Sequence, residues 1–128
     1  MQWQKNMQLI DANVILRYLL NDHEEMSMKA KNLIASGTAY TKPEVIAEVV
    51  YVLKGVYTIE RKEIRSFIYT LLKDIHCSEA DCVLYAMDIY SENSLDFVDC
   101  LLIAYNKINR ENIFSFDKKL NKKLEFIE

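Results

Sequence analysis

The sequence predicts an α/β domain with a mainly parallel sheet. Short apolar runs that suit strands alternate with longer amphipathic stretches that suit helices, which is the order that a parallel sheet requires. Only 2 glycines and 1 proline interrupt the chain, so helix is abundant and connections are short. The length of 128 residues and the 51% of apolar residues suit a single core. We therefore expect one domain over 7–128, preceded by a polar tail over 1–6.

Apolar spacing and turn residues place the elements along the chain. The expected strands are short apolar runs and cover 8–11, 39–41, 75–77, 112–116 and 126–127. The expected helices carry apolar residues at helical spacing and cover 14–20, 24–36, 43–54, 59–73, 78–90, 97–109 and 118–124. The clearest apolar stripe is Ile64, Phe67, Ile68, Leu71 and Leu72.

Cap residues predict where these helices begin and end. Thr41 fits the first position of a capping box, since a glutamate follows three residues later and the proline lies in the first turn. Ser78 fits the first position of a similar motif. Thr58 is the expected N-cap of the helix over 59–73. Gly37 and Gly55 are expected to end the helices that precede them, since glycine tolerates the left-handed conformation that follows many helices.

Composition limits the classes of function. A net charge of −3 excludes a generally basic nucleic-acid binder, so nucleic acid must be held by local Lys/Arg patches or through a bound cation. Cys77, Cys82 and Cys100 lack C-x-x-C spacing and suit small buried residues in a reducing compartment. No signal-peptide pattern is visible, and no apolar run approaches the length of about 18 residues that spans a membrane. We expect a cytoplasmic protein without membrane contact.

Four acids stand in apolar surroundings. Asp11 ends the first expected strand, Glu48 lies within VIAEVVYVL, Asp99 lies near the head of DFVDCLLIAY, and Asp117 follows IFSF. A lone buried carboxylate costs on the order of several kcal/mol, so each acid would need a partner. Purely structural roles are also open. Asp11 and Asp117 could be helix N-caps. Asp99 could be a first-turn acid that is stabilised by the helix dipole, and Glu48 could be salt-bridged or face solvent.

A bound cation would partner all four acids at once. Four converging carboxylates repel one another by about 4 kcal/mol per close pair at an effective dielectric near 20. All-oxygen ligands favour Mg²⁺ or Mn²⁺ over zinc, and His23 and His76 are isolated, which suits surface or structural roles. Carboxylate-held Mg²⁺ generally acts on phosphate esters. The chain has no glycine-rich phosphate loop, which excludes a P-loop nucleotide site.

At these residues the sequence resembles a PIN-domain ribonuclease, specifically a VapC-type toxin of a toxin–antitoxin system. The resemblance covers 7–128 and rests on four segments in order: IDANVILRYLL, KPEVIAEVVYVL, LDFVDCLLIA and FSFDKKL. It implies a three-layer α/β/α sandwich around a short parallel sheet. It also implies a Mg²⁺-dependent endoribonuclease that forms a homodimer and is neutralised by a cognate antitoxin protein.

The same resemblance implies roles for individual residues. The implied metal ligands and catalytic residues are Asp11, Glu48, Asp99 and Asp117. Asn13 and Ser115 would orient carboxylates or water. Asp96 lies one helical turn before Asp99, and either joins the site as an outer acid or caps the helix over 97–109.

A mechanism follows as a hypothesis. Asp11 and Asp99 would hold the principal Mg²⁺, while Asp117 and Glu48 bind it directly or through water. A metal-activated water would hydrolyse the RNA phosphodiester and leave a 5′-phosphate and a 3′-hydroxyl. The residues expected to steer the RNA backbone are Arg17, Lys118, Lys119, Lys122 and Lys123. The four lysines also suit an ordinary solvated helix face.

Two rival functions stay open at this level. The first is a PIN-like module that binds metal or RNA without cutting it. The second is a receiver-type phosphoacceptor domain, which wants two adjacent acids after the first strand, whereas Ala12 follows Asp11. A haloacid-dehalogenase-like phosphatase would want a second aspartate where Asn13 stands. The homodimer is mainly what the resemblance implies; the segment 49–57 adds only that it has more apolar surface than one buried helical face requires, much of which core packing explains.

Overall fold

The structure, a computed structural model, describes residues 6–126. Within this range the chain forms three short strands and seven helices. The strands are β1 (Gln8–Leu9), β2 (Ala39–Thr41) and β3 (His76–Cys77). The helices are α2 (Ala12–Leu20), α3 (Glu24–Ala35), α4 (Pro43–Gly55), α5 (Arg61–Asp74), α6 (Ala80–Glu92), α7 (Phe97–Asn109) and α8 (Lys118–Phe126). Every helix that the sequence predicts therefore has a counterpart.

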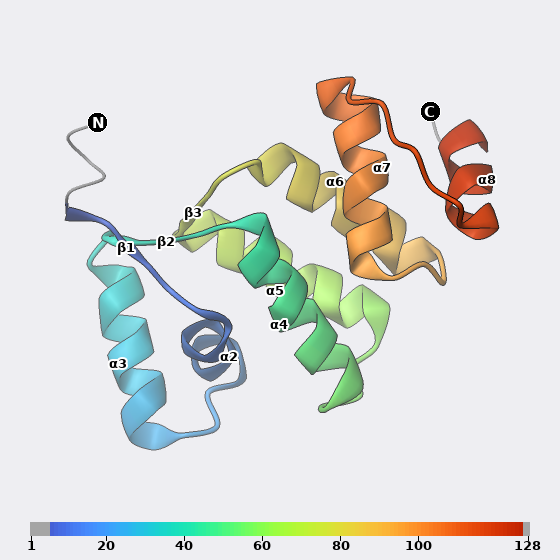
Figure 1. Ribbon diagram of the computed structural model, residues 1–128. Helices are drawn as coiled ribbons and strands as arrows, with labels where there is room; N and C mark the ends of the chain where they lie inside the picture. Colours follow the sequence, from blue (N-terminus) through green and yellow to red (C-terminus); the bar gives the residue numbers. More distant parts are fainter. Residues whose placement is uncertain (1–5, 127–128) are drawn as a thin grey trace.

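The three strands form one parallel sheet in the order β1-β2-β3. Gln8 is paired with Ala39, and Thr41 is paired with Cys77. Helices flank this sheet, and α4 lies between α2 and α7 in Figure 1. The structure confirms the expected α/β/α architecture. Asp11 follows β1 at the carboxyl end of the sheet, the edge at which ligand sites of parallel sheets usually lie.

The core is built mainly from aliphatic side chains of the helices. Ile15 of α2, Ile46 of α4, Ile103 of α7 and Met87 of α6 are fully buried. The stripe predicted in α5 is confirmed at its centre, where Ile64, Ile68 and Leu71 are fully buried while Phe67 and Leu72 are partly covered. This continuous core holds α4 and α7 in fixed positions, which matters because both carry candidate site residues.

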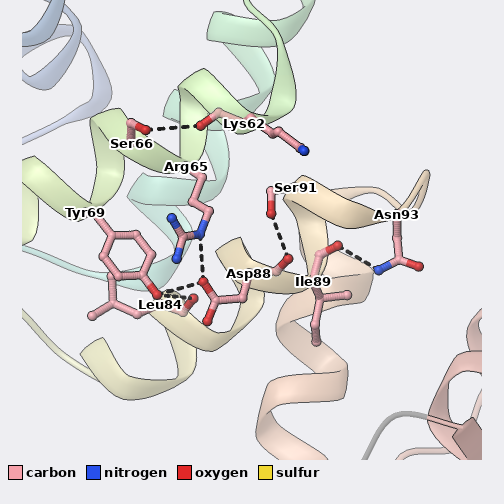
Figure 2. A network of polar contacts seen from close by, with 9 residues as sticks. All are labelled: Lys62, Arg65, Ser66, Tyr69, Leu84, Asp88, Ile89, Ser91 and Asn93. Carbon is pink, nitrogen blue, oxygen red and sulfur yellow. Dashed lines mark hydrogen bonds and ion pairs between the residues drawn. The ribbon is translucent and has the colours of Figure 1, made fainter.

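A polar network joins α5 to α6 at the surface (Figure 2). The Asp88 carboxylate accepts a hydrogen bond from Arg65 Nε at 2.8 Å and another from Tyr69 Oη at 2.7 Å. The Arg65 guanidinium also lies 4.2 Å from the centre of the Tyr69 ring. Ser91 Oγ donates to the backbone carbonyl of Asp88 at 2.9 Å. The network ties two neighbouring helices together and shares no residue with the predicted site.

Three predicted N-caps are wrong. Thr41 is a buried residue of β2, and α4 begins after Lys42 instead. Thr58 has a positive φ of 52°, and α5 begins two residues later than expected, after Glu60. The N-cap of α6 is Glu79 rather than Ser78. In each case the cap position is set by the direction in which the chain leaves the preceding strand or turn, which a local hydroxyl does not decide.

The two glycines behave differently from each other. Gly37 follows α3 with a φ of +79°, the left-handed conformation that glycine adopts without strain, as predicted. Gly55 lies inside the last turn of α4, and Val56 is the C-cap. The helix therefore runs one residue further than its glycine suggests.

The expected strand over 112–116 does not form. Instead this segment connects α7 to α8 on the far side of α7 from the sheet (Figure 1). Phe114 and Phe116 are 84% and 90% exposed, and their rings lie 5.2 Å apart, edge to face. Strand formation needs a neighbouring edge, and α8 is held away from the sheet by packing on α7, where Leu120 is buried. Of the last expected strand, residue 126 belongs to α8 and residue 127 lies outside the described range.

The three cysteines are buried and free, as predicted. Burial raises the pKa of the Cys77 and Cys100 thiols to about 12, so both stay protonated at neutral pH and act as apolar packing groups. Over residues 6–126, no helix has the length and apolar character needed to cross a membrane.

Candidate active site

Asp11 occupies the junction between β1 and α2. It is the N-cap of α2, and its Oδ1 accepts a hydrogen bond from the Val14 backbone amide at 3.0 Å. The structure thus confirms the capping interpretation. The cap uses one carboxylate oxygen, and the side chain is exposed. An acid in this position can still offer its second oxygen to a ligand.

Glu48 lies on the solvent-facing side of α4. The opposite face of the helix, formed by Ile46, Val49, Val50 and Leu53, packs into the core, while Glu48 is exposed. The expectation of a buried carboxylate is therefore wrong, and the solvent-facing alternative is confirmed. Glu48 lies three residues before Tyr51, so the two side chains are neighbours on the helix surface.

Asp99 lies on the first turn of α7 and is partly buried. Burial raises its pKa above the ordinary value of 3.8, and the negative charges of Asp117 and Asp96 raise it further. The nearby Lys119 ammonium acts in the opposite direction and lowers the pKa of Asp99. Three carboxylates and one cation thus gather where α7 begins.

Asp117 is held at the start of α8 by local hydrogen bonds. Its Oδ1 accepts from the Leu120 amide at 2.9 Å, which caps the helix. Its own backbone amide donates to Ser115 Oγ at 2.9 Å, and Asn121 Nδ2 donates to the Ser115 carbonyl at 2.8 Å. Ser115 therefore orients Asp117 through the backbone.

Asp96 holds the N-cap position of α7, as the structural alternative predicts, but its side chain makes no capping hydrogen bond. Its carboxylate instead lines a cavity between the end of α4 and the start of α7. The cavity has a volume of about 360 Å³. Other residues that line it are Val50, Tyr51, Lys54, Arg61 and Asp99.

Arg61 forms a fixed wall of this cavity. Its Nη1 donates to the carbonyl oxygens of Tyr90 at 3.1 Å and Leu95 at 2.7 Å. The guanidinium also lies 4.1 Å from the centre of the Tyr90 ring, a cation–π contact. These contacts lock the turn between α6 and α7 and so fix the approach to Asp96.

Two of the four predicted acids, Asp99 and Asp117, lie close enough together to interact. Asp96, Asp99 and Asp117 interact electrostatically, whereas neither Asp11 nor Glu48 contributes to the shifted pKa of Asp99. Across residues 6–126, no group of three or more His, Cys, Asp or Glu side chains is placed to hold a metal ion. Mg²⁺ is commonly held by one or two carboxylates together with water and substrate phosphates. The donor chemistry of Asp99 and Asp117 fits that cation.

The predicted RNA-contacting cations fall in two places. Arg17 is largely covered: its guanidinium donates to Tyr57 Oη at 3.1 Å and pairs with Asp22 at 3.3 Å. With Asn13 it lines a separate hollow between α2 and α3. Lys119 lies close to Asp99, and its Nζ donates to the Ser94 carbonyl at 3.4 Å. The remaining lysines of α8, Lys118, Lys122 and Lys123, are exposed or partly exposed.

Sequence reasoning missed three residues that line the cavity: Tyr51, Lys54 and Arg61. The signal for Tyr51 and Lys54 was present, because they follow Glu48 at three-residue steps along one helix. Arg61 had no comparable signal, since its partners are backbone carbonyls of a distant turn.

Comparison with known proteins adds the family. The model of the PIN domain matches residues 9–124. The chain belongs to the PIN-domain family. This PIN domain is also similar to a protein named VapC ribonuclease from Aquifex aeolicus (strain VF5). The two are 29% identical over an alignment of 129 positions, which covers 91% of each chain. No solved structure matches it. The family resemblance seen in the sequence is thereby confirmed.

Proposed function

We propose that this PIN domain is a Mg²⁺-dependent endoribonuclease of the VapC type and acts as the toxin of a type II toxin–antitoxin pair. The observation that supports it most directly is the position of Asp99, whose pKa is raised by burial and by the carboxylates of Asp117 and Asp96. Acids with shifted pKa values that border a cavity are common at catalytic sites. The similarity to a VapC ribonuclease points to RNA as the substrate.

The proposed metal ligands are Asp99 and Asp117, with Asp11 and Glu48 as the further acids of the site. Mn²⁺ suits the same oxygen ligands. When bound, a divalent cation neutralises phosphate oxygens and lowers the pKa of a water molecule. It would also relieve the repulsion from Asp117 and Asp96 that adds to the effect of burial in raising the pKa of Asp99.

The chain's own residues position the reacting groups. Ser115 and the capping bond to Leu120 hold Asp117 in one orientation, so that its second oxygen is presented in a fixed direction. Asn13, in the first turn of α2 two residues after Asp11, is proposed to orient water or a carboxylate. The Lys119 ammonium balances part of the negative charge at Asp99 and would meet an incoming phosphate, with Lys118 beside it.

A cleavage assay tests the proposal. Purified protein with Mg²⁺ is expected to cut RNA, and EDTA is expected to stop it. Asp99→Asn and Asp117→Asn should each lower the rate at least about a hundredfold, as expected for a metal ligand rather than an outer-shell group. Glu92→Gln, which removes the charge of an exposed acid on α6, is the control and should cut normally. Equal cleavage by Asp99→Asn and the unaltered protein would contradict the proposal.

A non-catalytic metal- or RNA-binding module is the second candidate. The observation that favours RNA binding without cleavage is that residues 6–126 contain no acid group of three or more in position to hold a metal. Metal titration that shows binding, together with RNA incubation that shows no cleavage products, would favour this alternative over the nuclease.

The partners are part of the same proposal. A cognate antitoxin protein and a second copy of this chain are the expected partners in a cytoplasmic setting. Exposed apolar side chains after the end of α4 support a protein contact there: Val56 and Tyr57 are 69% and 37% exposed. Light scattering would measure the oligomeric state, and co-expression with the neighbouring reading frame would test neutralisation.

A further inference from the structure

We propose that the cavity between α4 and α7 binds one unstacked guanine base of the RNA, stacked on Tyr51 and read by Asp96. This inference rests on the nuclease function proposed above and specifies the base that flanks the cut. Asp99 lines the same cavity as Tyr51 and Asp96, so a base held there would place its own phosphate beside the candidate catalytic carboxylates.

The cavity has the size and lining of a small-molecule site. Its volume of about 360 Å³ lies within the range of roughly 300–1,000 Å³ that is usual for ligand sites. Val50, Phe97 and Val98 give it apolar walls, and Arg61 fixes its position through two backbone carbonyls. A flat aromatic ligand with a few polar edge atoms suits such a lining.

Tyr51 supplies the stacking surface. Its side chain is 78% exposed although it lies on a helix whose opposite face is fully buried. Proteins that recognise single-stranded RNA stack splayed bases on aromatic rings of this kind. Lys54 follows three residues later on the same helix and lines the same cavity, so it places a cation near the backbone of a stacked nucleotide.

Asp96 selects the base. Within residues 6–126 its carboxylate does not cap the helix, so both oxygens can accept hydrogen bonds from a ligand. An ionised carboxylate only accepts, and it satisfies two adjacent donors when they lie on the same edge of a base. Guanine offers such a pair, N1–H and N2–H, whereas adenine and cytosine each place an acceptor beside their donor. Guanine is therefore the base that this carboxylate pairs with through two hydrogen bonds.

The test compares single-stranded oligoribonucleotides that differ only in the base beside the mapped cut. For the unaltered protein, kcat/KM should be about tenfold higher with guanine than with adenine. Inosine, which lacks the N2 amino group, should lose much of that advantage. Asp96→Asn should remove the difference between guanine and inosine, because an amide cannot accept from both donors. A purely structural role of Asp96 would not change the base preference.

Variants at position 51 test the stacking. Tyr51→Ala should lower kcat/KM about tenfold with every base, whereas Tyr51→Phe keeps the ring and should keep the rate. Met28→Ala is the control, because Met28 is an exposed apolar residue of α3 that does not line the cavity. It should cut like the unaltered protein.

Binding separates this inference from the nuclease function. Fluorescence anisotropy without Mg²⁺ should show tighter binding of the guanine oligonucleotide, and Asp96→Asn and Tyr51→Ala should weaken it even if no RNA is cut. Cleavage with no preference at either flanking position would overturn the inference and leave the nuclease standing. So would Tyr51→Ala protein that binds and cuts RNA normally but loses its dimer or its neutralisation by antitoxin, since the cavity would then serve a protein partner.

Discussion

Asp99, on the first turn of α7, has a pKa that is raised first by burial and then by the carboxylate of Asp117 at the start of α8. The two acids are carried by different helices, and the packing of α8 against α7, with Leu120 buried, brings them together. Like charges placed close together store repulsion that a cation or a proton relieves. The pair therefore links the stability of the fold to the occupancy of the proposed site.

We predict that Asp99→Asn stabilises the protein at pH 7 by no more than about 1 kcal/mol, since solvent screens a partly exposed acid. The folded-state pKa of Asp99 is raised, so its ionisation costs stability above that pKa. The cost disappears as the pH falls below the ordinary value of 3.8. Urea unfolding at pH 7 and at acid pH measures the change. A gain that stays constant with pH, or that Glu125→Gln matches, would contradict the prediction.

Thr41→Val is expected to stabilise the fold. Thr41 is fully buried, and within the described part of the chain its Oγ1 has no hydrogen-bond partner. Burying such a hydroxyl costs about 1–3 kcal/mol, and valine has nearly the same shape without the polar atom. The free energy of unfolding should rise by about 1 kcal/mol. Thr70→Val, at an exposed site on α5, should change it little. A loss of stability would show that the hydroxyl is satisfied.

Arg61→Met should destabilise the protein by about 2–3 kcal/mol, because the carbonyls of Tyr90 and Leu95 lose a charged donor. Lys62→Met, on the exposed neighbour, is the control and should fall within about 0.5 kcal/mol of the unaltered protein. Thermal unfolding of both variants provides the comparison. Equal melting temperatures would show that Arg61 does not lock the turn between α6 and α7.

Asp88→Ala should lower the free energy of unfolding only slightly, since the Arg65–Asp88 pair is 40% and 50% exposed. Part of the loss should remain in concentrated salt, because Tyr69 also donates to Asp88 and that hydrogen bond is not an ion pair. Glu25→Gln removes an ion pair with Lys29 that is 76–77% exposed, and its smaller effect should vanish in salt. Urea unfolding with and without 1 M NaCl separates the two cases, because the Debye length falls to about 3 Å at that salt concentration.

The helices and the parallel sheet were predictable because their signals are local. Apolar spacing in α5 and the strand–helix alternation survive in the structure almost unchanged. The caps at Thr41, Thr58 and Ser78 were not predictable, since the direction of the chain decides which residue caps a helix. The prediction of a strand over 112–116 was wrong for a related reason. Residues with high β propensity need the edge of a sheet to pair with, and the packing of α8 holds this segment away from the sheet.

The acids divide in the same way. The candidate acids could be identified from the sequence, because a carboxylate within an apolar run stands out. Their environment could not be identified in this way: Glu48 faces solvent because α4 buries its opposite side, and only tertiary packing shows that Asp96, Asp99 and Asp117 form one group. The cavity beside them depends on Arg61, whose backbone partners carry no sequence signal.

The segment that carries Phe114 and Phe116 has a practical consequence. Both rings project from an exposed connection, so a protease that cuts after aromatic residues would find its preferred site there. One cut would leave Asp99 on the large fragment and Asp117, with the lysines of α8, on a short peptide. The acid pair would then persist only while that peptide stays packed on α7, with Leu120 buried and the Leu124 carbonyl accepting from Lys107 Nζ. On dilution the nicked protein would lose half of its proposed metal ligands.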